Sequence, residues 1–412
     1  MSPSDRPVRV LYSFPHKLGA DRICYTAWQQ VRGLAAAGAD LLVYPGALQR
    51  PVPANVRVNP TLAWGKLRIP YRLLGTMRAL AVHDHIVARR VEKLAGKIDI
   101  IHTWPDAALE TLKVASAMGI PTVLERPNAH TRFAYTAVQQ EAKRLGMVLP
   151  RTDEYYFRED ILCKEEKEYQ LTDYLLCASE FSKQTFLDQG LPAEKLLRHQ
   201  YGYDEKAYYP DASKDGRITG GLTMLFAGEA AVRKGVHFAL EAWLNSPAHR
   251  DGRFLIAGRF LQVYAQKLSA MLAHPSVQVL GHRDDLPELM RKSDLFVLPS
   301  VEEGFGLVCV EAIGSGAVPL VSAACTDICH HMGNSLVHPV GDVKTLTEHI
   351  TMLYEDRALL QRLRASCIRT APSCTWTAAG LRLLDVYRDV LRSRSEKAAR
   401  ETVAENASAQ CL

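Results

Sequence analysis

The chain has 412 residues, enough for two domains of ordinary size, and its 47% hydrophobic and 23% charged residues exclude fibrous and disordered proteins. A net charge of +5 is too small to imply a nucleic-acid partner. No apolar stretch is long enough for a signal peptide or a bilayer span, and the nine cysteines are odd in number and scattered. We therefore expect a cytoplasmic protein with free thiols.

The chain opens with the pattern of a βαβ unit. Residues 8–14 are rich in β-branched and aromatic side chains and predict a strand, and a loop containing Gly19 follows. A helix is expected over 23–38 and a second strand over 40–44. A strand, a helix and a second strand in this order indicate a parallel sheet.

The segment 64–97 is strongly basic, with eight lysines and arginines against two acidic residues, and apolar residues lie between them. It has two interpretations. It can be a basic amphipathic surface for an anionic membrane or an anionic acceptor, which would make the protein peripheral at the membrane. It can equally be an exposed helix face whose apolar side belongs to the core.

Polar residues follow a further buried strand, expected at 121–124. The loop 125–131 comes at the carboxyl end of that strand, which is where parallel sheets bind ligands. His130 is the candidate in this loop, although a single loop histidine is more often a surface residue than a catalytic one. A charged helix is expected over 153–170.

The second half of the chain repeats the alternation of strand and helix after a linker at 211–221, which is rich in Asp, Ser, Lys and Gly. This alternation predicts a doubly wound parallel sheet in each half. Domains are therefore expected at 1–210 and 222–375. The strands expected in the second half are 222–227, 254–258, 277–281, 295–298 and 318–321.

Two cations, Arg233 and Lys234, lie in the loop after the first strand of the second half, at the start of a helix. Cations are unfavourable at the amino end of a helix unless an anion is held there. The pair is therefore a candidate phosphate site, and the alternative is an exposed basic pair.

Two carboxylates flank a glycine-rich turn in the stretch 294–322. Glu303 precedes a predicted helix and Glu311 lies within it, while Gly304 and Gly306 leave room for a ligand against the main chain. Carboxylates accept several hydrogen bonds, so this pair suits a ligand with many hydroxyls, such as a hexose and a ribose. The alternative is two solvated glutamates.

The spacing Glu303-x7-Glu311, written Glu-Gly-Phe-Gly-Leu-x3-Glu-Ala-x3-Gly-x-x-Pro, resembles the signature of the retaining glycosyltransferases of family four. The resemblance implies an α/β GT-B fold, with two Rossmann-like doubly wound parallel-sheet domains facing a cleft. It also implies that the amino-terminal domain binds the acceptor, that the carboxyl-terminal domain binds a nucleotide sugar, and that a terminal helix at 376–392 packs back on the first domain. Residues 393–412 are expected to form a disordered tail.

The resemblance also implies roles for single residues. Lys234 would contact the donor diphosphate with support from Arg233, Glu303 would hold the transferred sugar, Glu311 would hold the ribose, and His130 would lie near the donor sugar. The catalytic candidates are His130, Arg233, Lys234 and Glu303, and the donor-binding candidates are Gly19, Arg233, Lys234, Glu303, Gly304, Phe305, Gly306, Leu307 and Glu311.

The chain departs from the family pattern in two places. The family often has a pair of glycines after the first strand, and this chain has Gly19-Ala20. The family commonly has an arginine after the glycine that opens the loop before Arg233, and this chain has Glu229. With Glu229 in place of that arginine, the family's phosphate clamp is incomplete in this chain.

We expect a hexosyltransferase that uses a UDP- or GDP-sugar, acts on a saccharide or lipid-linked glycan, and needs neither cofactor nor metal. The sequence contains no Asp-x-Asp motif, with which such enzymes usually hold a divalent metal. The metal-like cluster Cys325-x3-Cys329-His330-His331 lacks a second ligand pair at zinc-site spacing. The alternatives are a nucleotide-sugar epimerase and a non-catalytic GT-B subunit that binds a partner.

Overall fold

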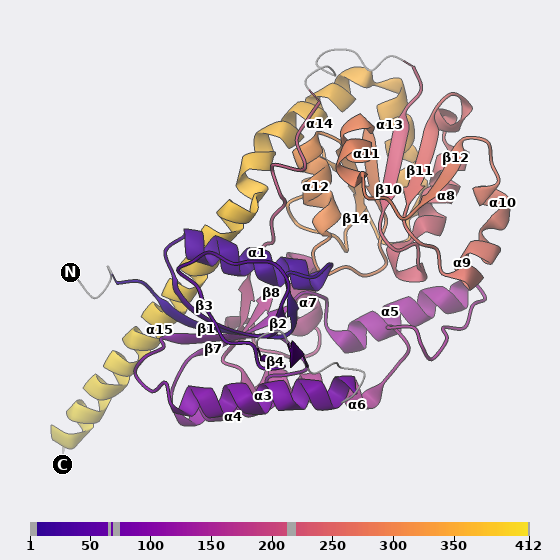
Figure 1. The fold of residues 1–412 in the computed structure, drawn as a ribbon. Coiled ribbons are helices and arrows are strands. Elements are labelled where there is room, and N and C mark those ends of the chain that lie inside the picture. Colours follow the sequence, from indigo (N-terminus) through magenta and orange to yellow (C-terminus); the bar gives the residue numbers. More distant parts are fainter. Residues whose placement is uncertain (1–5, 65–66, 69–74, 212–219, 411–412) are drawn as a thin grey trace.

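The computed structural model describes residues 6–64, 67–68, 75–211 and 220–410. Within them the chain forms two α/β domains, each built on one parallel sheet, and Figure 1 shows the domains stacked one above the other. The prediction of a GT-B fold is confirmed. Parts of the segment 64–97 and of the linker 211–221 lie outside the described residues.

The amino-terminal sheet has seven strands in the order β3-β2-β1-β6-β7-β8-β9. Its strands are near-continuous apolar runs that are buried on both faces, as is usual where helices cover a parallel sheet. The strands are β1 (Arg9–Leu18), β2 (Asp40–Leu48), β3 (Arg57–Val58), β6 (Ile100–Thr103), β7 (Thr122–Arg126), β8 (Tyr174–Cys177) and β9 (Leu196–Arg198). The helices are α1 (Ile23–Ala36), α3 (Thr76–Glu92), α4 (Leu109–Ala117), α5 (Thr131–Arg144), α6 (Glu159–Leu171) and α7 (Glu180–Leu187). Two short strands, β4 (Ala63–Trp64) and β5 (Leu67–Arg68), form a separate antiparallel pair.

The carboxyl-terminal sheet has six strands in the order β12-β11-β10-β13-β14-β15. The chain starts in the middle of the sheet at β10 and crosses over to reach β13, so the carboxyl ends of these two strands mark the switch point at which sheets of this kind bind ligands. The strands are β10 (Thr223–Ala227), β11 (Arg253–Ala257), β12 (Val277–Gly281), β13 (Leu295–Leu298), β14 (Val318–Ser322) and β15 (Leu336–His338). The helices are α8 (Val236–Asn245), α9 (Gln262–Lys267), α10 (Ser269–Leu272), α11 (Leu286–Lys292), α12 (Leu307–Ser315), α13 (Val343–Glu355) and α14 (Arg357–Thr370).

The last helix, α15 (Trp376–Gln410), leaves the carboxyl-terminal domain and runs along the amino-terminal one (Figure 1). It packs on α1 where Gly33 meets Gly380, and a Cβ added to Gly380 would lie 2.4 Å from the carbonyl carbon of Gly33. The two helices can therefore approach so closely only without side chains at this crossing. The tail that the sequence predicts to be disordered is helical as far as Gln410, since Ala, Glu, Arg and Lys are strong helix formers.

Helix α5 belongs to the amino-terminal half but also packs against the other domain. Its residues Val138 and Ala142 share a buried apolar cluster with the carboxyl-terminal strands. The Oε1 atom of Glu141 lies 2.8 Å from Nε2 of His237 on α8. This helix therefore ties the domains together beside the start of α8.

Within the described residues, no helix is both long and apolar enough to cross a membrane.

Candidate functional site

A short loop after β10 carries the two predicted phosphate-binding cations. Residues Val232–Lys234 form a single 3-10 turn, and Gly235, with a φ of 64°, ends it and begins α8. The backbone oxygen of Arg233 accepts a hydrogen bond from the N–H of Val301 at 2.8 Å. The loop after β10 is thereby joined to the loop after β13, where the predicted carboxylate lies.

The side chains of these two loops form a buried charge cluster. The Nη1 atom of Arg233 lies 3.3 Å from a carboxylate oxygen of Glu302 and 3.3 Å from one of Glu303. The ammonium of Lys234 donates to the other oxygen of Glu303. The sequence predicted Arg233, Lys234 and Glu303, and the structure brings all three together. We name these four residues, Arg233, Lys234, Glu302 and Glu303, the charge cluster.

The cluster keeps Glu303 ionised. Burial alone raises the pKa of Glu303, but the charges of Arg233 and Lys234 outweigh it and lower that pKa to about 2. Burial raises the pKa of Glu302, against the opposing charge of Arg233. With two cations and two carboxylates, the site has no surplus positive charge when both glutamates are ionised.

Main-chain groups of the amino-terminal domain press against the glycine-rich turn. A Cβ on Gly304 would lie 1.6 Å from the carbonyl oxygen of Pro127, so no side chain fits there. The hydroxyl of Ser179 donates to the oxygen of Gly304 at 2.6 Å, and the N–H of Ala129 donates to Glu302 at 3.2 Å. The predicted turn therefore lies where the domains meet.

The remaining donor-binding candidates on this turn have separate environments. The ring of Phe305 is buried against Tyr201, with ring centroids 5.3 Å apart, so this side chain is part of the core. Gly306 caps α12, and Leu307 is its first residue. Burial raises the pKa of Glu311 to about 7, although a hydrogen bond with the Tyr208 side chain opposes this rise.

The loop after β1 faces the loop after β10 across the domain boundary. Gly19 lies in a turn closed by its N–H and the oxygen of Cys24. Arg22 follows with a φ of 57° and a ψ of −130°, a strained conformation that costs about 1–3 kcal/mol for a residue with a side chain. Its Nη2 atom lies 3.3 Å from Glu229. Exposed ion pairs of this kind contribute between nothing and about 1 kcal/mol to the free energy of unfolding.

His130 has a different environment from the one expected. Its side chain caps α5 by accepting from the N–H of Arg132 at 3.2 Å, and its ring packs on Tyr169 and Phe186. Burial, together with Arg126 and Arg132, lowers its pKa to about 4.

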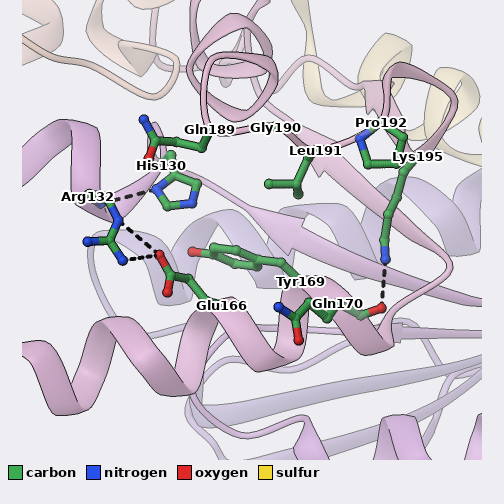
Figure 2. Close-up of a pocket in the computed structure, with 10 residues that line it drawn as sticks. All are labelled: His130, Arg132, Glu166, Tyr169, Gln170, Gln189, Gly190, Leu191, Pro192 and Lys195. Carbon is green, nitrogen blue, oxygen red and sulfur yellow. Dashed lines mark hydrogen bonds and ion pairs between the residues drawn. The ribbon is translucent and has the colours of Figure 1, made fainter.

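The ring of His130 also lines a pocket of about 560 Å³ walled by α6 and the segment 189–195, all within the amino-terminal domain (Figure 2). Its neighbour Ala129 is the residue that contacts the charge cluster, through the main chain. His130 is therefore linked to the other candidates through the backbone of Ala129 and not through its own side chain.

Two residues of this site were not predicted from the sequence. One is Glu302, a member of the charge cluster, which is fully buried against Arg233. Tyr155 was placed inside a predicted helix, but α6 starts only at Glu159, and the ring of Tyr155 lies 5.4 Å from the guanidinium carbon of Arg233. The two adjacent glutamates were a signal in the sequence that could have identified Glu302. No motif near Tyr155 in the sequence indicates its place in the site.

The cysteine and histidine residues near 325–331 do not gather around one point. Cys325 and Cys329 are buried, and Cys325 donates to the oxygen of Leu298, while His330 and His331 are exposed. Across the part of the chain that the structure describes, no group of three His, Cys, Asp or Glu side chains is placed to hold a metal ion.

Comparison with known proteins agrees with this geometry. Residues 221–356 match the family model described as glycosyl transferases group 1. An N,N'-diacetylbacillosaminyl-diphospho-undecaprenol alpha-1,3-N-acetylgalactosaminyltransferase of Campylobacter jejuni is 31% identical over 29% of this chain and 32% of its own length. A GDP-mannose:cellobiosyl-diphosphopolyprenol alpha-mannosyltransferase of Xanthomonas oryzae is 30% identical over 36% of this chain and 40% of its own length. The alignments thus span less than half of either relative.

Solved structures match nearly the whole fold. HepE of Anabaena, crystallised with UDP, superposes with a TM-score of 0.64 at 16% identity, covering 93% of this chain and 100% of that one. Sucrose-phosphate synthase of Thermosynechococcus elongatus gives 0.66 at 18% identity, covering 94% and 100%. At these identities the likeness shows the fold alone.

The charge cluster predicts an asymmetric response to losing a charge. Replacing Arg233 by Met leaves two buried carboxylates with one cation, so we expect Arg233→Met to lower the free energy of unfolding by about 3 kcal/mol or more in urea denaturation. The matched control is Arg283→Met, which removes an arginine from an exposed pair with Asp285 and should change little. Equal small changes in both variants would contradict the buried cluster.

Proposed function

Because residues 221–356 match the family model of the group 1 glycosyl transferases and the chain has the GT-B fold, we propose that it belongs to that family and is a retaining hexosyltransferase. In this proposal it moves a hexose from a UDP- or GDP-sugar to a hydroxyl of a saccharide or lipid-linked glycan. The observation that carries the proposal is the convergence of Arg233, Lys234 and Glu303 from the loops after two neighbouring strands of the carboxyl-terminal sheet. Parallel sheets bind ligands at such a crevice.

Cations would hold the diphosphate of the donor, and carboxylates would accept hydrogen bonds from the hydroxyls of its sugar and ribose. Arg233 and Lys234 are placed to bind the diphosphate, and Glu303 to accept hydrogen bonds from the sugar. Glu311, the fifth residue of α12, would hold the ribose hydroxyls with the main chain of Gly304 to Leu307 alongside. Lys234 is paired with Glu303 in the structure. A bound donor would therefore share Lys234 with this carboxylate.

The transfer itself would occur on one face of the sugar. The bond between the anomeric carbon and the phosphate oxygen breaks, and its electron pair stays on that oxygen. The acceptor oxygen forms the new bond on the same face and passes its proton to the departing phosphate. Cations near the phosphate favour this step because negative charge grows there. His130 would contribute by fixing the backbone of residues 127–130 against the sugar side of the site.

The acceptor class is proposed from the relatives. The names of the Campylobacter and Xanthomonas proteins both contain a polyprenol diphosphate that carries a saccharide. We propose that this chain also acts on a lipid-linked saccharide, in polysaccharide biosynthesis, and that the amino-terminal domain binds this acceptor. We also propose that no metal takes part, because the sequence has no Asp-x-Asp motif with which to hold one at the diphosphate.

A membrane contact would suit such an acceptor, and α3 offers a surface for it. The exposed face of α3 combines the apolar Met77 and Val82, which are 48% and 38% exposed, with basic residues. Arg78, Arg89 and Lys93 are exposed along the same side, while Leu80 and Val87 face the core. The exposed face of α3 supports the membrane proposal, and its buried face belongs to the core, as the other interpretation of the segment expects.

Donor binding can be tested by thermal unfolding with UDP-, GDP- and ADP-sugars and the free diphosphates. A ligand at about a hundred times its dissociation constant adds about 2.7 kcal/mol of stability. We expect a UDP or GDP compound to raise the midpoint with or without a chelator, and Glu311→Ala to abolish the shift.

Glu348→Ala removes an exposed glutamate of α13 and is the control that should keep the nucleotide-induced shift. A shift that disappears with chelator would overturn metal independence. Turnover without an acceptor would indicate an epimerase, and no shift with any nucleotide would favour a non-catalytic subunit.

Membrane contact can be tested by sedimentation with phosphatidylcholine vesicles that contain or lack phosphatidylglycerol. We expect retention on the anionic vesicles that falls as salt rises. Arg89→Glu with Lys93→Glu should weaken retention by at least about tenfold, since each basic residue near such a surface contributes about 1 kcal/mol. Arg388→Glu with Arg392→Glu makes the same charge change on α15 and should retain binding. Equal binding to both kinds of vesicle would refute the electrostatic contact.

A further inference from the structure

Arg22 is an exposed cation on a strained backbone, opposite the loop after β10. It lies between the turn at Gly19 and the first residue of α1, and its φ of 57° with a ψ of −130° favours glycine. Its side chain is 82% exposed. A residue with a side chain persists in such a conformation only where the surroundings impose it, and strain of this kind gathers at ligand-binding sites.

The partner of Arg22 lies on the other domain. The Nη2 atom of Arg22 is 3.3 Å from Glu229, which is 44% exposed and lies five residues before Lys234 in the loop after β10. Because the pair is exposed, water screens it, and it neither offsets the backbone strain nor holds the guanidinium firmly. Arg22 can therefore exchange Glu229 for a stronger anion.

The charge of the site calls for a further cation. Arg233 and Lys234 are balanced by Glu302 and Glu303, so a bound diphosphate would bring negative charge that these four residues do not neutralise. Glu229 adds another negative charge to the same loop. A guanidinium can bind two phosphate oxygens at once, which makes it well suited to a diphosphate.

We propose that Arg22 binds the donor diphosphate from the amino-terminal domain, leaving Glu229 as the nucleotide enters. The proposal rests on the proposed function, because it requires a nucleoside-diphosphate ligand at the charge cluster. It gives the amino-terminal domain a donor-binding side chain in addition to its acceptor role. Donor binding would then draw the loop after β1 towards the loop after β10.

The competing explanation is that Arg22 and Glu229 merely latch the two domains together. The two explanations differ in what Glu229 does. A latch needs both partners, so removing either would weaken nucleotide binding alike. In our proposal Glu229 competes with the diphosphate for Arg22, and its removal strengthens binding.

The test is calorimetric titration of the full chain with UDP and GDP, using Arg22→Gly, Arg22→Lys and Glu229→Gln. Arg22→Gly should weaken binding of the diphosphate about ten- to a hundredfold, the loss expected for a charge-assisted hydrogen bond. Arg22→Lys should retain part of the affinity, and Glu229→Gln should bind at least as tightly as the natural chain. Since glycine relieves the positive φ, Arg22→Gly should keep or raise the unfolding midpoint, which separates lost binding from lost folding.

Each remaining outcome counts against the proposal. Unchanged nucleotide affinity in Arg22→Gly, with binding intact in the natural chain, would overturn the role of Arg22 and leave the proposed function standing. Weakening by Glu229→Gln to the level of Arg22→Gly would establish the latch instead. No binding of UDP or GDP by the natural chain would remove the proposed function and the role of Arg22 together.

Discussion

The pairing of Arg233 and Lys234 with Glu302 and Glu303 is the interaction on which the site depends. Charges are buried in proteins only when they are paired, and breaking one pair leaves another charge uncompensated. Here the pairs join the loop after β10 to the loop after β13, and Glu302 also receives the N–H of Ala129 from the other domain. The cluster therefore joins the two loops to each other and to the amino-terminal domain.

The amino-terminal domain meets the segment around this cluster at three separate points. Tyr155 covers the guanidinium of Arg233, Arg22 pairs with Glu229, and Glu141 binds His237 at the start of α8. These three contacts come from different elements but converge on residues 229–237. A ligand that changes the charge balance of the cluster would therefore alter contacts of both domains.

Much of the fold could be predicted from the sequence because buried parallel strands are continuous apolar runs. The strands at 277–281 and 295–298 have the bounds that the sequence predicts. Glu303 stood out because a glycine-rich turn and a second carboxylate surround it. Tyr155 and the short strand β15 did not stand out, because their positions depend on partners far away in the chain. The prediction of a disordered tail after residue 392 was wrong for another reason. It rested on the low hydrophobicity of this segment, whereas its many helix-forming residues favour a helix.

The central claim is that a nucleoside diphosphate binds at the charge cluster between the domains, and hydrogen exchange with mass spectrometry tests it most directly. Amide exchange should be compared with and without saturating UDP or GDP. The account predicts slower exchange in residues 228–235 and 299–311, with further protection in the loop at 18–24 from the other domain. Protection confined to other parts of the chain, with 228–235 and 299–311 unchanged in the presence of a bound nucleotide, would contradict it.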